Sequence, residues 1–523
     1  MGLTDAAGEE TKEKRERGTC ARCIKEQDLL YGTQSLSEVL LMSLERRGGL
    51  HTPRGYNVTM MRFQLLVFLL LVAVCTAALF VHHVDRKKHE HRRQSSQLRY
   101  NAVTPLSELQ RTSYGSILKE IPESAQIVLI GEGTHGTEEF FRIRSELTKH
   151  LIENYGFDAV ICEGDVQPFY QLSKISSRDN IRQSLSDIFD HHFPDWMWSN
   201  VPMASWMHTR SKQQQLMGMD IQSPFSSIDF IINLLDELGD QKSMALANEC
   251  YATLNSFRQN IRRYGDAVYA NKVPSQASAV QKVVETLSEI YADVEDSKTF
   301  ELLHNAHVVA ASEEYHRQRI FPGQSAAWNT RTKAFMDCIL RSRDNISRVK
   351  QRDSNHESTS VKLIVWAHNS HVGDMRSTGY ASQGQVSLGQ LCREMFGKEG
   401  VFLIGMTTYE GTVRAAHADR QGACWKGKGD VMVLKNGLED SHEAHLHGIA
   451  TKMKQESNEA AFGLNLKGTD QDIAASFDCS RLERFVGSCY LPQMELMSHY
   501  SHCNLANQFD YVFHVDKSSA ITV

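Results

Sequence analysis

The sequence predicts an α/β fold in which a mainly parallel sheet is flanked by helices, with a helical insertion and one apolar segment ahead of the main domain. Short aliphatic runs alternate with helical patterns from about residue 100 to the C-terminus, as in proteins with parallel sheets. Residues from about 226 to 350 carry long helical patterns with few glycines or prolines, which predicts an insertion or lid. A 17-residue apolar run at 65–81 predicts the segment before the domain.

The N-terminal part divides into three predicted regions. Residues 1–60 are rich in charge and glycine and predict a flexible polar tail. Residues 61–84 predict a single transmembrane anchor, or a signal peptide if translation begins close to residue 60. Residues 85–104 form a basic linker to the main domain, which we expect at 105–523.

The orientation of the expected single-pass membrane protein stays open. Basic residues are denser after the apolar run, which favours a cytoplasmic main domain. The glycosylation sequons at Asn57 and Asn345 would point to opposite sides of the membrane if both were used. These signals conflict, so the sequence does not orient the chain.

The predicted strands of the main domain are short aliphatic runs. The first, at 127–130, has four consecutive aliphatic residues, which is typical of a strand covered on both faces. A helix is predicted after it over 137–154, with Thr137 as the N-cap. The remaining strands are expected at 159–162, 216–221, 363–367, 401–406 and 511–515.

Composition excludes some classes of function. The chain is 41% hydrophobic and 23% charged, which is typical of a globular domain, and its net charge of -6 gives no basic footprint for nucleic acid. The 11 cysteines lack the dense pairing of a disulfide scaffold. No GxSxG motif occurs, which disfavours a serine nucleophile.

Polar side chains follow three of the predicted strands. Glu132 and His135 come after the first strand and Glu163 after the second. His368 and His371 come after the strand at 363–367. Because open α/β sheets bind ligands at the carboxyl ends of their strands, we expect these side chains to form the functional site.

The turn at Gly131, Gly133 and Gly136 also matches GxGxxG between a strand and a helix, the pattern of a dinucleotide-binding unit. Glu132 would place a negative charge beside the pyrophosphate, and Glu163 follows Gly131 by 32 positions instead of about 20. A dinucleotide-dependent oxidoreductase is therefore the least favoured hypothesis.

A metal-dependent hydrolase is a further alternative, although no cofactor is otherwise expected. The carboxylates and histidines at the strand ends include the nitrogen and oxygen ligands of a zinc or manganese site, and such an ion would lower the pKa of bound water to about 7. No HExxH motif occurs. The similar run HEAHLH at 442–447 is one residue too short, and we interpret it as a solvated helix face.

Three tryptophans, Trp196, Trp198 and Trp206, are interleaved with methionines. Such clusters usually belong to a hydrophobic core. In a pocket they would suit a large apolar substrate, so they are the candidate substrate-binding residues.

Several motifs occur in an order that resembles the erythromycin esterase family. The sequence contains GEGTHG at 131–136, CEGD at 162–165, DWMW at 195–198, WAHNSHVGD at 366–374, GTV at 411–413 and QFDYVFHVD at 508–516. The resemblance runs from near residue 105 to the end of the chain. The N-terminal tail and anchor, and the segment at 415–427, depart from the family pattern.

The resemblance implies an esterase-like hydrolase that cleaves a carboxylic ester or macrolactone with water activated directly at the protein. A macrolide is the type substrate, so a response to antibiotics is one candidate role. Mapped onto this chain, His135 is the expected general base, and Glu132 and Glu163 are expected to orient it or the water. Imidazole suits the task because it titrates near neutrality.

The same resemblance implies how the developing oxyanion would be stabilised. His368 and His371 are expected to donate hydrogen bonds to the carbonyl oxygen, with Arg144 as a further cation nearby. A membrane-tethered binding or scaffold protein with an inactive hydrolase fold is the alternative from another class, because fold alone does not imply function.

Overall fold

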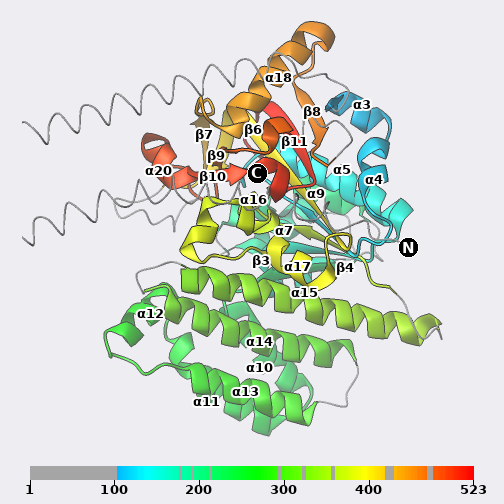
Figure 1. The fold of residues 1–523 in the computed structure, drawn as a ribbon. Helices are drawn as coiled ribbons and strands as arrows, with labels where there is room; N and C mark the ends of the chain where they lie inside the picture. Colours follow the sequence, from blue (N-terminus) through cyan, green and yellow to red (C-terminus); the bar gives the residue numbers. More distant parts are fainter. Residues whose placement is uncertain are drawn as a thin grey trace, which may run out of the picture. The chain divides into compact units, whose positions relative to one another are not determined.

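The computed structural model describes residues 103–175, 180–190, 192, 194–210, 215–291, 296–320, 325–354, 360–417, 429–467 and 475–523. Helices cover both faces of a central sheet, and further helices form a layer on one side of it (Figure 1). The sheet has nine strands within the described residues, in the order β1-β8-β11-β6-β2-β5-β3-β4, with β7 paired to β6.

Six neighbouring strands of this sheet are parallel, and they are the six that the sequence predicts. In sheet order they are β11 (Tyr511–Ser518), β6 (Val401–Ala415), β2 (Ile127–Ile130), β5 (Leu363–Trp366), β3 (Ala159–Asp165) and β4 (Gln215–Asp220). The predicted mainly parallel arrangement is confirmed.

The short antiparallel strands were not predicted. These are β1 (Val103–Pro105), β7 (Asp430–Leu434) and β8 (Ala461–Asn465) of the main sheet, and β9 (Ser480–Arg484) and β10 (Tyr500–Asn504), which form a separate two-stranded sheet. β7 reads DVMVL, with four consecutive apolar residues, yet most of its side chains are exposed, so an apolar run by itself does not mark a buried strand.

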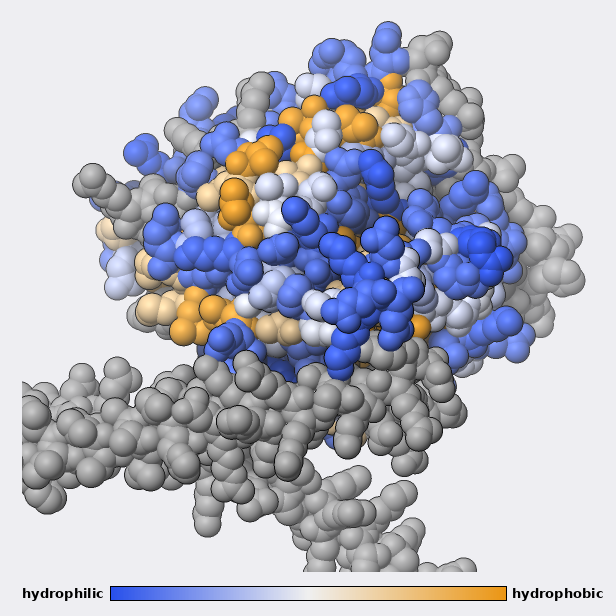
Figure 2. Space-filling view, turned by 90° about the horizontal axis from the view of Figure 1, so that it is seen from above, coloured by the Kyte–Doolittle hydropathy of each residue, from blue (hydrophilic) through white to orange (hydrophobic). Residues whose placement is uncertain are grey.

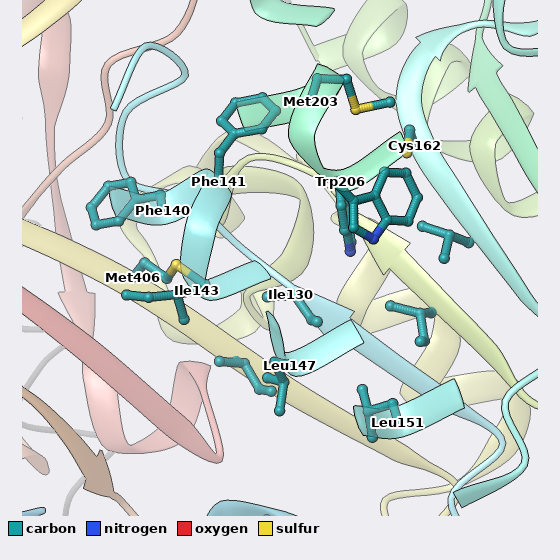
Figure 3. Close-up of a cluster of buried hydrophobic side chains, with 14 of the residues drawn as sticks. Ile130, Phe140, Phe141, Ile143, Leu147, Leu151, Cys162, Met203, Trp206 and Met406 are labelled. Carbon is teal, nitrogen blue, oxygen red and sulfur yellow. The ribbon is translucent and has the colours of Figure 1, made fainter. Parts of the chain in front are cut away.

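Residues of the central strands alternate between two hydrophobic cores. In β2, Val128 and Ile130 belong to one core, whereas Ile127 and Leu129 belong to the other, because successive side chains of a strand point to opposite faces. The predicted helix is α5 (Glu138–Tyr155), and it covers the first face. Figure 3 shows its residue Leu147 beside Ile130, and Leu151 further along the helix in the same cluster.

Further helices complete the two faces. On the side of α5 the first core includes residues of α3 (Leu106–Arg111), α4 (Gly115–Glu120), α6 (Val166–Ser173), α7 (Ile181–Phe189), α8 (Asp195–Trp198) and α9 (Val201–Thr209). The opposite core includes residues of α16 (Asn369–Val372), α17 (Leu388–Phe396), α18 (His442–Ser457) and α21 (Leu505–Gln508). The short helix α20 spans Glu495–His499.

The region of the predicted helical insertion consists of consecutive helices. It comprises α10 (Phe225–Glu237), α11 (Gln241–Asn255), α12 (Arg262–Tyr269), α13 (Ala277–Ile290), α14 (Ser297–Gln318) and α15 (Ser325–Ser354). These helices have a core of their own, which includes Ile231, Tyr251 and Leu302. Val308 of α14 and Phe335 of α15 belong instead to the core on the face of the sheet opposite α5. The insertion therefore packs on the sheet through these two helices. Figure 1 shows α15 between the sheet and the other insertion helices.

The HEAHLH run does not form a solvated helix face, so that expectation is wrong. It opens α18, where His442, Glu443 and His445 are buried. Nε2 of His442 lies 2.9 Å from the carbonyl oxygen of Cys503, and Oε1 of Glu443 accepts a bond of 2.8 Å from the Arg484 amide. Strands β9 and β10 therefore supply partners for this turn inside the protein.

The predicted tail, membrane anchor and most of the basic linker lie outside the described residues. Within those that are described, no helix is both long and apolar enough to cross a bilayer. The anchor at 61–84 and its single-pass topology therefore stay predictions. The face drawn in Figure 2 is mostly hydrophilic with separate hydrophobic patches, in keeping with the globular composition of the chain.

Candidate active site

The carboxyl ends of four adjacent parallel strands, in the order β2, β5, β3 and β4, form one edge of the sheet. All the polar strand-end residues of the sequence prediction lie here. This edge carries, in chain order, Glu132, His135, Glu163, Asp220, His368 and His371. The topology therefore brings together residues that lie more than 200 positions apart in the sequence.

A cleft of about 500 Å³ opens over this edge. Five of the strand-end residues line it; Glu132 lies beneath it, fully buried. The apolar lining includes Phe189, Met197, Trp198, Trp328 and Phe485. A volume of this size is within the range of small-molecule sites in proteins.

Beneath the cleft, His135, Glu132 and Arg144 form a buried chain of contacts. Nδ1 of His135 lies 2.9 Å from Oε1 of Glu132, and Oε2 of Glu132 lies 3.1 Å from Nη2 of Arg144. The guanidinium of Arg144 also lies over the rings of Phe141 and Trp366, at 4.3 and 5.0 Å from their centroids. Glu132 and Arg144 are both completely buried, so each supplies the countercharge that the other needs.

The surroundings of His135 favour its protonated form. Burial acts to lower the pKa of His135, but the hydrogen bond to Glu132 and the charges of Glu163 and Glu132 outweigh it, so the pKa is raised above the ordinary 6.5. Because a carboxylate only accepts hydrogen bonds, Nδ1 carries the proton in the neutral ring. Nε2 is then the nitrogen that can take a proton from a reactant.

Glu163 accepts hydrogen bonds from two neighbours. Its Oε1 accepts a bond of 2.8 Å from Nη2 of Arg331, and its Oε2 accepts one of 2.8 Å from the backbone amide of His368. Burial acts to raise the pKa of Glu163, but His371 and Arg331 outweigh it and lower the pKa below its usual range. Glu163 is therefore a fixed negative charge at the cleft wall.

Arg331, from helix α15, connects the insertion to the strand ends. It forms two bonds with Asp220, Nε to Oδ1 at 2.9 Å and Nη2 to Oδ2 at 2.6 Å, in addition to its bond with Glu163. Its Nη1 donates to Nε2 of His371 at 2.9 Å. Trp328, one turn earlier on α15, stacks on the His371 ring with centroids 4.4 Å apart.

These contacts keep His371 neutral and fixed. Burial lowers the pKa of His371 to about 3, which the charge of Glu163 only partly opposes. Since Nε2 accepts from Arg331, Nδ1 carries the ring proton. That nitrogen is buried and has no hydrogen-bond partner in the described part of the chain.

His368 lies close to His135, with ring centroids 4.8 Å apart. Burial lowers its pKa well below the ordinary value, and the charge of His135 acts in the same direction, so the ring is neutral. Its Nδ1 lies 2.8 Å from the Ser370 hydroxyl, and its Nε2 makes a long contact of 3.3 Å with the carbonyl oxygen of Gly133. The weaker of these two bonds is the one on Nε2.

Three of the predicted site residues lie away from the cleft. Arg144 is buried behind Glu132, so it does not approach a bound carbonyl oxygen. Trp206 packs against Trp366 in the core at 4.7 Å, and Trp196 is 2% exposed and also outside the cleft lining. Only Trp198 of the three tryptophans lines the cleft, whereas the other two belong to the core on the side of α5.

Sequence reasoning missed Asp220, Arg331 and Trp328. The signal for Asp220 was present, since it ends a strand that was predicted. Arg331 and Trp328 carry no comparable signal, because they lie inside a long helix far from any strand end. Only the packing of α15 on the sheet brings them to the site.

The metal hypothesis has limited support in this geometry. Within the residues that the structure describes, no group of three or more His, Cys, Asp or Glu side chains has an arrangement that could hold a metal ion. The histidines and carboxylates at the strand ends are bonded to one another and to arginines instead.

Fold and cleft together define an α/β protein with a histidine and carboxylate site at the edge of a parallel sheet. The family model described as erythromycin esterase matches residues 152–518, which is more than half of the chain. The chain therefore belongs to the erythromycin esterase family, and the resemblance in its motifs is confirmed. The matched range begins after Glu132 and His135, so the family model does not include these two residues.

Several proteins are similar to this chain at low sequence identity. Erythromycin esterase type I of Escherichia coli is 21% identical over 282 residues, which span 49% of this chain and 64% of that protein, less than two thirds of its length. A Bacillus cereus protein has a TM-score of 0.61 at 17% identity, covering 83% of this chain and 99% of its own. A succinoglycan biosynthesis protein has a TM-score of 0.60 at 17% identity, covering 83% and 98%.

A histidine-to-asparagine mutant of the erythromycin esterase EreC, solved in its open conformation, has a TM-score of 0.56 at 18% identity. The match covers 80% of this chain and 98% of that one. At these identities the solved structures show the fold, a large mixed sheet flanked by helices.

Replacing Arg144 by alanine should destabilise the protein by about 3–5 kcal/mol, because it leaves Glu132 as an unpaired buried charge. Arg142 on the same helix is the matched control, since its side chain is 65% exposed and pairs with Glu138 at the surface. Arg142→Ala should change stability by less than about 1 kcal/mol. Urea unfolding of both variants measures the difference. Equal unfolding midpoints would show that the buried pair does not stabilise the fold.

Proposed function

We propose that this chain hydrolyses a carboxylic ester or lactone with a water molecule activated by His135. The observation that carries the proposal is the bond of 2.9 Å between Nδ1 of His135 and the buried Glu132. This bond fixes the tautomer in which Nε2 is the proton acceptor, at a residue that lines the cleft. Family membership supports the same class of reaction.

The reaction needs only one group that first takes and then returns a proton. Nε2 of His135 removes a proton from water while the water oxygen forms a bond with the ester carbonyl carbon. The tetrahedral intermediate then breaks its bond to the alkoxide, which takes the proton back from the His135 imidazolium. Such general acid–base help typically accelerates a reaction by about 10² to 10⁴.

The carboxylates stabilise the charged stage of this cycle. Glu132 accepts the hydrogen bond from Nδ1–H throughout, and the negative charge of Glu163 favours the imidazolium that forms after proton transfer. Arg144 acts through Glu132 as a positioning residue, because it supplies the countercharge of that buried carboxylate. The two carboxylates outweigh the effect of burial on His135, so the pKa of His135 stays raised.

We assign the stabilisation of the oxyanion to Nε2–H of His368. Its Nε2 bond to the Gly133 carbonyl is long, at 3.3 Å, so a bound carbonyl oxygen competes easily for this proton. His371 is buried and held by Arg331 and Trp328, and we assign it a structural role in the wall of the cleft.

The lining of the cleft suggests a substrate with a substantial apolar part. Trp198, Trp328, Met197 and Phe485 supply aromatic and aliphatic surface beside the strand ends. A macrolide, the substrate class in the names of the family and of the Escherichia coli relative, is one candidate. A smaller ester with an apolar portion is the other.

The direct test is mass spectrometry of erythromycin and a panel of small esters incubated with the full-length chain, scoring addition of one water. His135→Ala should abolish turnover, whereas His208→Ala, which changes an exposed histidine outside the cleft, should not. Chelator treatment should leave the rate unchanged.

Other outcomes of this experiment would support the alternative functions. Turnover that is lost on chelation would favour a metal-dependent hydrolase that uses the same residues. No turnover of any ester by the folded protein would contradict the proposal and favour a binding or scaffold role. A rise in melting temperature with a nicotinamide dinucleotide would support the oxidoreductase hypothesis.

Replacing Glu132 by glutamine should move the acid limb of the kcat/KM profile to lower pH. Glu132 raises the pKa of His135, so its neutralisation lowers that pKa and keeps the base deprotonated in more acidic solution. At neutral pH we expect kcat/KM to fall by about 10-fold to 100-fold, because the ring is held less firmly and is a weaker base. Glu138→Gln, which changes a carboxylate of α5 that pairs with Arg142, is the control. An acid limb that stays in place or moves to higher pH would contradict the role given to Glu132.

A further inference from the structure

Two arginines of the helical insertion, Arg262 and Arg319, line the same cleft as His135. Arg262 is the first residue of α12, and Arg319 directly follows the last residue of α14. The mechanism proposed above uses neither of them. They form a second group of cleft-lining side chains that comes from the insertion.

A close contact between the two helices brings these arginines together. Gly265 of α12 packs against α14 so tightly that a Cβ atom there would lie 2.2 Å from the carbonyl oxygen of His316. Arg262 precedes Gly265 by about one helical turn, and Arg319 follows His316 by the same interval. Both arginines therefore lie within about one helical turn of this contact.

The charge of Arg319 acts on Arg262. Burial lowers the pKa of Arg262 to about 9, and the charge of Arg319 acts in the same direction. A positive charge on the first residue of α12 is also unfavourable to the helix dipole. Two partly buried guanidinium groups at one wall of a cleft are the arrangement that binds carboxylates and phosphates elsewhere in proteins.

The carboxylates of the described cleft lining are bonded to other groups. Glu163 and Asp220 are both bonded to Arg331. Asp165 lies 2.9 Å from Nδ1 of His192 and accepts a further bond of 3.3 Å from the Ser223 amide. Each acidic side chain of the described lining therefore already has partners at the strand ends.

We propose that Arg262 and Arg319 form a subsite for an anionic oxygen group of the substrate, a carboxylate or a phosphate. Resting on the hydrolase function proposed above, this makes the preferred substrate an acidic ester. Its ester group is attacked at His135, its apolar part lies along Trp198 and Trp328, and its anionic group is held by the insertion. A neutral ester of the same length is then the poorer substrate.

A matched pair of esters tests the charge preference. Mono(4-nitrophenyl) suberate and 4-nitrophenyl octanoate differ only in a terminal carboxylate in place of a methyl group. With the full-length protein we expect kcat/KM for the suberate ester to be at least about 10-fold higher, since a hydrogen-bonded charge pair contributes that much or more. Arg262→Gln and Arg319→Gln should each lower this value by about 10-fold and leave the octanoate ester within twofold.

Two control variants separate charge from structure. Arg262→Lys and Arg319→Lys keep the charge and should retain part of the preference. Arg258→Gln changes an arginine of the same insertion that pairs with Asp229 outside the cleft, and it should have no effect. Loss of both esters in the glutamine variants, or equal loss in Arg258→Gln, would overturn the assignment.

A binding measurement tests the proposed anion subsite independently of catalysis. Suberate and hexyl phosphate, titrated calorimetrically into the full-length protein, should bind, and both glutamine variants should weaken binding by about 10-fold; the tighter of the two ligands identifies the anionic group. If no ester is hydrolysed but the anions bind as expected, the hydrolase function fails and the subsite stands. If esters are hydrolysed without a charge preference and the anions do not bind, the subsite fails and the hydrolase function stands.

Discussion

The buried ion pair between Glu132 and Arg144 is the constraint on which the rest of the site depends. A carboxylate in the core is strongly destabilising without a partner, and helix α5 supplies that partner from beneath the turn after β2. Arg144 is itself held between aromatic rings of α5 and β5. Paired with Arg144 in this way, Glu132 orients His135 and raises the pKa of His135 at the edge of the cleft.

A second buried centre, around Arg331, makes the helical insertion part of the site. Its guanidinium joins Glu163 of β3, Asp220 of β4 and His371 after β5, so one side chain of α15 links the ends of three strands. The insertion also brings Trp328 to the cleft wall and contributes the arginine pair. The sheet thus supplies the proton-transfer groups, and the insertion supplies much of the surface that a substrate would contact.

Features set by local pattern could be predicted from the sequence, whereas features set by packing could not. Aliphatic runs such as 127–130 identified all six parallel strands, and the rule that ligands bind at strand ends selected His135, Glu163, His368 and His371 before the sheet order was known. No local rule marks Arg331, which lies within a long helix, or distinguishes the cleft residue Trp198 from the core residue Trp206. The first turn of α18 looked solvated because its polar partners, on β9 and β10, are distant in sequence.

Nuclear magnetic resonance of ¹⁵N-histidine-labelled protein, with His135 assigned by comparison with His135→Ala, can measure both the tautomer and the pKa of the proposed general base. We expect that neutral His135 carries its proton on Nδ1 and that its pKa lies above 6.5. A proton on Nε2 of the neutral ring, or a pKa at or below 6.5, would show that Glu132 does not prepare this histidine to accept a proton from water.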